Sequence, residues 1–235
     1  MIVRDDGSTA VLITQPDHAA LAARLMSAWR LGGLIDHPRR AAILRAVEEH
    51  DHGWRDLDVA PIVDEAGRLL DFVSAPVDLR QGVWYRGVDR LAATPWVAAL
   101  VARHALEIYD RFRGDPAWTP FFAAMRERCD RHRADAGGST PDLDADYEFV
   151  RIGDLLSLTF CANWPGEQRG AVRIARDDAT VLVSPDPFGG LVVPFEVPAR
   201  EMPAGPFASA AAAAEAWSMA RRVTLTGTAR GAAPA

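Results

Sequence analysis

The sequence predicts a mainly α fold, a helical bundle with a short N-terminal hairpin and a small C-terminal antiparallel β-sheet. The chain has 235 residues, of which 49% are hydrophobic, so it can bury one sizeable core. Apolar residues recur every three or four positions from about residue 16 to residue 163, which is the period of a helix face. After Trp164 the period changes to two, which indicates strands. We therefore expect a helical core with its hairpin over residues 1–163, and a β-rich extension of the same compact unit over residues 164–235.

The composition argues against several classes of function. The formal net charge is −6 and no basic run is present, which argues against a binder of nucleic acid or of a membrane surface. No apolar run approaches the ~18 to 20 residues of a membrane span, and the first residues lack the pattern of a targeting signal. Every basic side chain is arginine, which excludes sites that need lysine, such as a phosphate-binding loop or a Schiff base. Cys129 and Cys161 fall in predicted helices, so we expect no disulfide framework and a cytoplasmic location.

The elements follow in order along the chain. Residues 1–14 alternate around a turn at Asp6-Gly7 and predict a hairpin. Capping residues, prolines and glycines then mark six helices, from Pro16 to Gly32-Gly33, from about Asp36 to Gly53, and over residues 77–93, 95–112, 118–133 and 145–162. A polar loop is expected over residues 55–75. The last part predicts strands at residues 171–174, 180–184, 191–197 and 223–226, a surface helix over residues 209–221 and a frayed tail at residues 231–235.

One stretch, residues 41–54, joins an apolar helix face to a histidine and a carboxylate. Val47, His50 and Asp51 fall on the same face, and Gly53 supplies the end of the helix. A buried carboxylate beside a buried imidazole needs a partner, because an unpaired buried charge costs roughly several kcal/mol. An adjacent His-Asp pair at a helix end is a compact pair of metal ligands.

Other helices bring further ligands to the same core. His18 lies near the start of the first helix on its apolar face, and Asp154 is the single carboxylate in the most apolar helix. His104 and His132 also face inward, although a lone inward histidine is more often a hydrogen-bonded core residue. A shared divalent ion would satisfy His18, His50, Asp51 and Asp154 at once. This set of imidazole and carboxylate ligands suits iron, manganese or zinc, with iron the first expectation, rather than calcium.

The order of these residues resembles that of a known superfamily. A His, then a His-Asp pair with Gly two positions later, then a late Asp resembles the HD-domain superfamily of all-α metalloproteins, over roughly residues 16–163. The sequence resembles more closely, along nearly the whole chain, the bacterial domain-of-unknown-function family 3891. The segments that carry this second resemblance are residues 15–18, 49–55, 70–72 and 154–158, together with His104 and Tyr109.

The sequence departs from the HD-domain pattern at one position and adds two histidines to it. Trp54 follows Gly53, where hydrolytic HD proteins often carry a lysine that is useful against phosphate. His104 and His132 resemble the later histidines of HD-type di-iron oxygenases, in which they hold a second metal that the Asp of the His-Asp pair bridges. The resemblance therefore implies one or two ions.

Three functions stay open. The first is a metal-dependent hydrolase of a small anionic ester, most simply a phosphate, in which Asp51 holds the metal beside His104 as general acid or base. Trp54, Arg55 and Arg86 would bind its small-molecule substrate, the arginines through bidentate contacts with the anion. The second is a di-iron oxygenase with the ligands His18, His50, Asp51, His104, His132 and Asp154. The third is a non-catalytic module that binds a ligand or partner, and a homodimer is compatible with all three.

Overall fold

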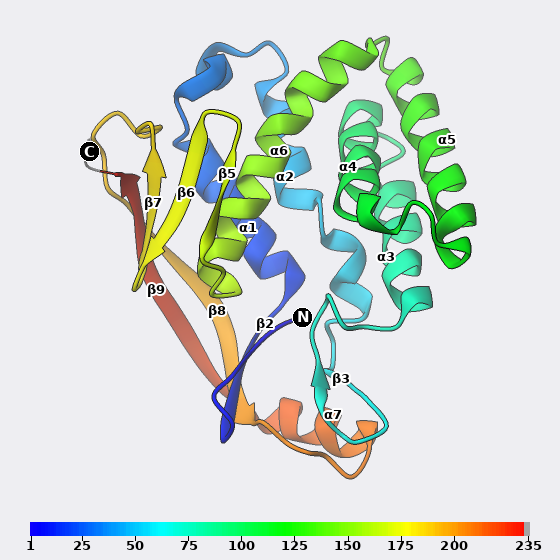
Figure 1. Cartoon of the computed structure of the whole chain (residues 1–235), viewed down its shortest axis with the longest axis vertical. Coiled ribbons are helices and arrows are strands. Elements are labelled where there is room, and N and C mark those ends of the chain that lie inside the picture. Colours follow the sequence, from blue (N-terminus) through cyan, green and yellow to red (C-terminus); the bar gives the residue numbers. More distant parts are fainter. Residues whose placement is uncertain (233–235) are drawn as a thin grey trace.

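A layer of α-helices lies against a curled β-sheet in residues 1–232, which the computed structural model describes (Figure 1). The helices are α1 (Gln15–Ser27), α2 (Arg40–Glu49), α3 (Val77–Arg90), α4 (Pro95–Ile108), α5 (Thr119–Asp135), α6 (Thr140–Cys161) and α7 (Ala210–Met219). Short 3-10 helices extend or connect them, namely η1 (Leu31–Asp36), η2 (His52–Asp56), η3 (Asp110–Phe112) and η4 (Pro116–Trp118). The six helices predicted before residue 163 are confirmed, with ends that differ by a few residues.

Capping side chains explain where two of these helices begin. The Thr14 side chain accepts a hydrogen bond from the backbone N–H of Asp17, and a proline follows in the first turn of α1. Ser139 and Asp142 form a capping box at the start of α6. The two caps place His18 in the first turn of α1 and Asp154 well inside α6.

Seven strands form one mixed sheet in the order β1-β2-β8-β9-β7-β6-β5. β7 and β9 run parallel, and the other neighbours run antiparallel. A separate hairpin of β3 (Ile62–Val63) and β4 (Leu69–Leu70) lies in the predicted polar loop. The strands of the large sheet are β1 (Ile2–Asp5), β2 (Thr9–Ile13), β5 (Gly166–Arg169), β6 (Val172–Asp177), β7 (Thr180–Ser184), β8 (Val193–Pro203) and β9 (Arg221–Gly231).

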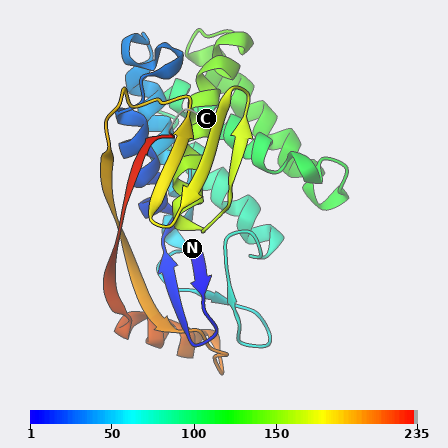
Figure 2. The ribbon, with the colours of Figure 1, turned by 60° about the vertical axis from the view of Figure 1, so that its left-hand side comes forward.

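The prediction of a mainly α bundle with a small C-terminal antiparallel sheet is wrong. The sheet is large and mixed, and it curls round the helices like half a barrel (Figure 2). The N-terminal hairpin is present as predicted, but it is part of this sheet, because β2 pairs with β8. Pairing between the two ends of the chain leaves no local pattern in the sequence, so periodicity could not reveal it.

The length of β9 was also missed. The strand has 11 residues, whereas the sequence predicted residues 223–226 alone. Val223, Leu225 and Ala229 are less exposed than most of their neighbours, but threonine, arginine and glycine occupy most other positions and weaken the apolar signal. Gly231 ends this strand rather than beginning a frayed tail, and residues 233–235 of that predicted tail lie outside the described residues.

Two glycines allow neighbouring helices to approach closely around the His50-Asp51 pair. A Cβ on Gly153 of α6 would lie 2.8 Å from Cγ1 of Val47 in α2, and one on Gly53 of η2 would lie 1.9 Å from the carbonyl oxygen of Val83 in α3. Both contacts are shorter than side-chain packing permits, so these positions require glycine. They hold α6 against α2 and the end of the His-Asp segment against α3.

Three further predictions concern the two cysteines, the absence of a membrane span and the division of the chain. Cys129 and Cys161 are buried and free, as the sequence indicated. No helix among the described residues has both the length and the apolar character needed to cross a lipid bilayer. The division of the chain at residue 163 stays a prediction.

Candidate metal centre

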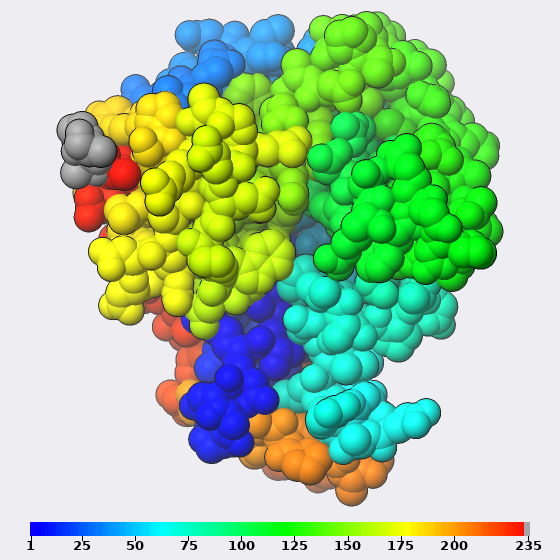
Figure 3. Space-filling model, in the orientation of Figure 1, coloured from blue at the N-terminus to red at the C-terminus, as the bar shows by residue number. Residues whose placement is uncertain are grey.

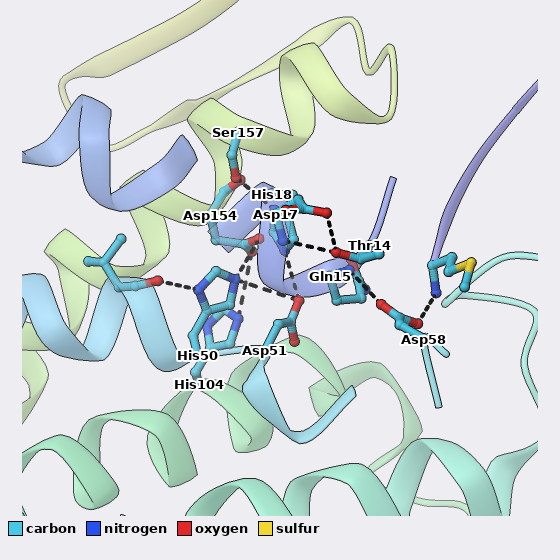
Figure 4. A network of polar contacts seen from close by, with 12 residues as sticks. Thr14, Gln15, Asp17, His18, His50, Asp51, Asp58, His104, Asp154 and Ser157 are labelled. Carbon is cyan, nitrogen blue, oxygen red and sulfur yellow. Dashed lines mark hydrogen bonds and ion pairs between the residues drawn. The ribbon is translucent and has the colours of Figure 1, made fainter. Parts of the chain in front are cut away.

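Five buried polar side chains meet where α1, α4 and α6 converge on the end of α2 (Figure 4). His18 comes from α1, His104 from α4 and Asp154 from α6, while His50 and Asp51 follow the last turn of α2. None is more than 7% exposed. Charged and imidazole groups at this depth need partners, because their desolvation is otherwise uncompensated.

The ligating atoms of these side chains form two groups that share His50. His18, His50 and Asp51 make one group and His50, His104 and Asp154 the other, with all ligating atoms of a group within 4.8 Å of one another. Asp51 Oδ2 lies 2.8 Å from His18 Nε2 and 3.6 Å from His50 Nε2. The Asp154 carboxylate lies 3.5 Å from His50 Nε2 and 3.7 Å from His104 Nε2.

Contacts outside the cluster orient the three imidazoles. His50 Nδ1 donates to the carbonyl oxygen of Val47 at 2.6 Å. The Ser157 hydroxyl donates to the Asp154 carbonyl oxygen at 2.9 Å, so it accepts from His18 Nδ1 at 2.8 Å.

His104 follows the same arrangement, because its Nδ1 lies 3.2 Å from the Tyr147 hydroxyl. Each Nδ1 is thus engaged, and each Nε2 faces a carboxylate: that of His18 faces Asp51, that of His104 faces Asp154, and that of His50 faces both. Protein metal sites hold their histidine ligands in this way.

The residues fit a metal ion. His50 Nε2 is buried and has no hydrogen-bond partner among the described residues. Three of the four nitrogen–oxygen separations exceed hydrogen-bond length, at 3.5, 3.6 and 3.7 Å. Ligands placed 2.0–2.2 Å from one ion lie roughly 3 to 3.6 Å from one another. These buried groups could therefore hold a metal ion.

The electrostatics of the cluster favour a cation at its centre. Burial lowers the pKa of His50, but the carboxylates of Asp51 and Asp154 outweigh this effect and raise that pKa to about 9. Burial raises the pKa of both carboxyls, but the surrounding imidazoles hold the pKa of Asp51 and of Asp154 below the usual value. Burial lowers the pKa of His104 to about 3, although Asp154 opposes the change. The two carboxylates stay ionised, and His104 stays neutral.

A pocket of about 340 Å³ opens onto this cluster. Figure 3 shows a hollow between the yellow-green surface near β5 and the green surface that follows α4. Asp51, His104 and Asp154 are the members of the cluster that line it. The other lining residues are mainly aromatic or basic: Trp54, Phe72, Trp84, Tyr109, Trp164, Arg80, Arg111 and Arg151. A small molecule in this pocket would reach the candidate metal position.

Some residues predicted for the site lie elsewhere. Trp54 lines the pocket, but Arg55 is exposed outside it, because the η2 turn directs it to solvent. Arg86 lies on the exposed face of α3, where its Nε is 3.6 Å from Asp56 Oδ2. His132 is buried on α5, which packs mainly against α4, and it belongs to neither ligand group. Helical spacing correctly indicated that His132 faces inward, but it could not indicate which neighbour it would face.

Other residues around the site were not predicted. Arg151 and Ser157 lie three positions before and after Asp154, a spacing that places them near it on α6 and could have drawn attention to them. Arg151 Nη1 lies 3.4 Å from Asp154 Oδ2. Arg80 of α3 and Arg111 of η3 carried no sequence signal, because only the packing of these two elements against α4 brings them to the pocket.

Replacing Ser157 with alanine is expected to weaken metal binding about 10- to 100-fold, the usual effect of losing an outer partner of a histidine ligand. The change removes the acceptor of His18 Nδ1–H and leaves the ligands themselves in place. Competition with a chromogenic chelator measures the affinity. Ser218→Ala is the matched control, because Ser218 makes the same hydroxyl contact with a carbonyl three residues earlier, in the peripheral helix α7. Equal affinities of Ser157→Ala and Ser218→Ala would contradict the assigned orientation of His18.

Comparison with known proteins identifies a family for most of the chain. Residues 1–204 match the family described as Protein of unknown function (DUF3891). No curated protein and no solved structure matches the chain. The matched region contains all five residues of the cluster. The resemblance to family 3891 is confirmed, and the HD-domain resemblance stays a prediction.

Proposed function

The chain belongs to the DUF3891 family, whose function is unknown, and we propose from its site that it is a metal-dependent hydrolase of a small anionic ester. The observation that carries the proposal is the orientation of the three imidazoles. His18, His50 and His104 each engage Nδ1 outside the cluster and turn Nε2 toward one or both of the buried carboxylates of Asp51 and Asp154. Burying these groups costs desolvation free energy, and they lie beside a pocket large enough for a small substrate.

Four residues would hold the ion: His18, His50 and Asp51 form one ligand group, and Asp154 of the other group would join them through their shared neighbour His50. Iron, manganese or zinc suits this set of nitrogen and oxygen ligands. When bound, such an ion supplies a Lewis acid that polarises the scissile ester and makes a water molecule more acidic. Asp51 and Asp154 also line the pocket, so they would orient that chemistry toward the substrate.

His104 would serve in proton transfer. It lines the pocket, and Tyr147 holds the far side of its ring. Because the ring is neutral, its Nε2 would accept a hydrogen bond from the attacking water and act as the general base. Trp84 packs against the imidazole with a centroid separation of 5.7 Å and keeps the ring in place.

The test measures metal content and hydrolysis together. Protein purified without added metal is analysed for elements, then assayed with p-nitrophenyl phosphate after loading with iron, manganese or zinc. We expect about one ion per chain and hydrolysis that a chelator abolishes. His104→Ala should keep the metal and lower kcat about 10²- to 10⁴-fold, whereas His132→Gln, outside the cluster, should change neither. Metal-loaded protein that hydrolyses none of a panel of small phosphate esters and carboxylic esters would contradict the proposal.

A specific observation favours a second function. The group formed by His50, His104 and Asp154 could hold another ion, which is the arrangement that a di-iron oxygenase would need. We rank it second because His132, the remaining ligand predicted for that ion, lies outside both groups. Two irons per chain and substrate-dependent oxygen uptake would favour the oxygenase. Protein that refuses every first-row ion would instead favour a non-catalytic module.

A further inference from the structure

One arginine at the pocket is held by a cluster of aromatic rings. The guanidinium carbon of Arg80 lies 5.2 Å from the ring centroid of Trp118, 5.5 Å from that of Phe112 and 6.0 Å from that of Tyr109. Phe112 and Trp118 stack with a centroid separation of 4.9 Å. Each ring attracts the cation and limits its rotamers. Arg80 is therefore positioned before any ligand arrives.

This arginine has no carboxylate partner of its own. Among residues 1–232 no acidic side chain forms an ion pair with Arg80 or with Arg111, whereas other arginines, such as Arg90 on the same helix as Arg80, do have such partners. Arg80 Nε is buried and makes no hydrogen bond within this part of the chain. Arg111 is exposed, with its guanidinium carbon 4.8 Å from the Phe112 centroid. Guanidinium groups without partners, held on one aromatic ring, are available to an incoming anion.

The aromatic cluster also connects this arginine to the candidate metal centre. Tyr109 accepts a hydrogen bond from the Trp84 indole N–H at 3.3 Å, and Trp84 packs against His104. Burial raises the pKa of Tyr109 to about 12, so its hydroxyl keeps its proton at neutral pH. Arg80, Tyr109 and His104 all line the same pocket. A ligand bound by Arg80 would therefore lie near the cluster.

The charge of the pocket suits a dianion. Arg80, Arg111 and Arg151 provide three positive charges among its lining residues, and Asp51, Asp154 and Glu167 provide three negative ones. A divalent ion at the centre would leave a surplus of two positive charges. A phosphate monoester dianion neutralises that surplus, whereas a carboxylate neutralises half of it. The volume of about 340 Å³ lies at the small end of ligand pockets, so the group esterified to the phosphate is small.

From these observations we infer that Arg80 and Arg111 form an oxyanion-binding site for the phosphate of a small phosphomonoester, with Arg151 at the floor of the same pocket. The inference rests on the proposed hydrolase and names its substrate class. Arg80 and Arg111 determine specificity, and Arg151, beside Asp154, completes the positive side of the pocket. The arginines predicted from the sequence, Arg55 and Arg86, play no part in it.

Binding of inorganic phosphate tests the site without requiring turnover. Isothermal titration calorimetry on the metal-loaded protein measures the Kd for phosphate and, separately, for acetate. We expect Arg80→Gln and Arg111→Gln each to raise the phosphate Kd about 10- to 100-fold, because each removes a charge-assisted hydrogen bond. Arg86→Gln is the matched control, because Arg86 is on the same helix as Arg80 but outside the pocket, and its Kd should stay within about twofold of wild type.

Fold and metal content are checked in every variant. Arg111 is exposed, so Arg111→Gln tests the site even if Arg80→Gln perturbs the aromatic cluster. Unchanged phosphate binding in both variants would overturn the inference, and acetate binding as tight as phosphate binding would overturn the phosphate assignment. Hydrolysis by wild type with unchanged phosphate affinity in the variants would refute the anion site alone. Arginine-dependent phosphate binding without hydrolysis of any phosphate ester would refute the proposed activity alone.

Discussion

Replacing Asp154 with alanine is expected to abolish metal binding and metal-dependent activity while the chain still folds. Asp154 faces two of the three inward imidazoles and is one of two carboxylates that balance the charge of an ion. Loss of an outer partner weakens metal binding about 10- to 100-fold, so loss of this carboxylate should exceed 100-fold. The fold should persist, because removal of one acidic side chain leaves the apolar packing of α6 in place.

Elemental analysis and hydrolysis assays measure the two losses, and circular dichroism checks the fold. Asp154→Asn, which preserves the shape of the side chain, separates the effect of charge from that of volume. Asp144→Asn is the matched control, because Asp144 belongs to the same helix but is exposed and pairs with Arg103. If Asp154→Ala binds as much metal as Asp144→Asn, Asp154 is not a ligand.

Removing the ion from the wild-type protein is expected to lower its melting temperature by about 10 °C. A ligand present at 1,000 times its Kd stabilises the native state by about 4 kcal/mol, and each kcal/mol shifts the melting of a chain of this size by about 2–4 °C. The physical reason is the burial of Asp51, Asp154 and His50 in one cluster, where an ion compensates their desolvation.

Thermal melting with and without chelator measures this shift. Readdition of the metal should restore the melting temperature, and Asp154→Asn should melt at the same temperature in both conditions because it holds no ion. Identical melting of metal-loaded and chelator-treated wild type would show that the ion does not support the fold. Together with metal-free purification and refusal of every first-row ion, that result would make a non-catalytic module the leading hypothesis.

Most residues of the cluster could be predicted, because each lies in a local sequence pattern that indicates where its side chain points. His50 and Asp51 continue an apolar helix face, His18 lies on the inner face of α1, and Asp154 is an isolated charge in an apolar helix. Each signal depends on the helical period, which the sequence shows directly. The inward direction of His104 followed from the same period.

The partners of those residues could not be predicted in the same way. His132 has the same inward signal as His104, yet α5 packs mainly against α4 and His132 belongs to neither ligand group. Arg80 and Arg111 reach the pocket from separate elements, and the rings that hold Arg80 come from η3, η4 and the end of α4. Periodicity indicates which face of a helix is buried but not what that face meets.

The sequence by itself therefore determined the helices, the N-terminal hairpin and the inward direction of the buried histidines and carboxylates. These properties depend on residues a few positions apart, whose spacing follows from helix and strand geometry. Only the tertiary structure decided that the hairpin joins a seven-stranded mixed sheet through β2 and β8, and that five buried side chains meet beside an arginine-lined pocket. Those outcomes depend on contacts between segments far apart in the chain, which are selected by the packing of whole elements and leave no periodic pattern in the sequence.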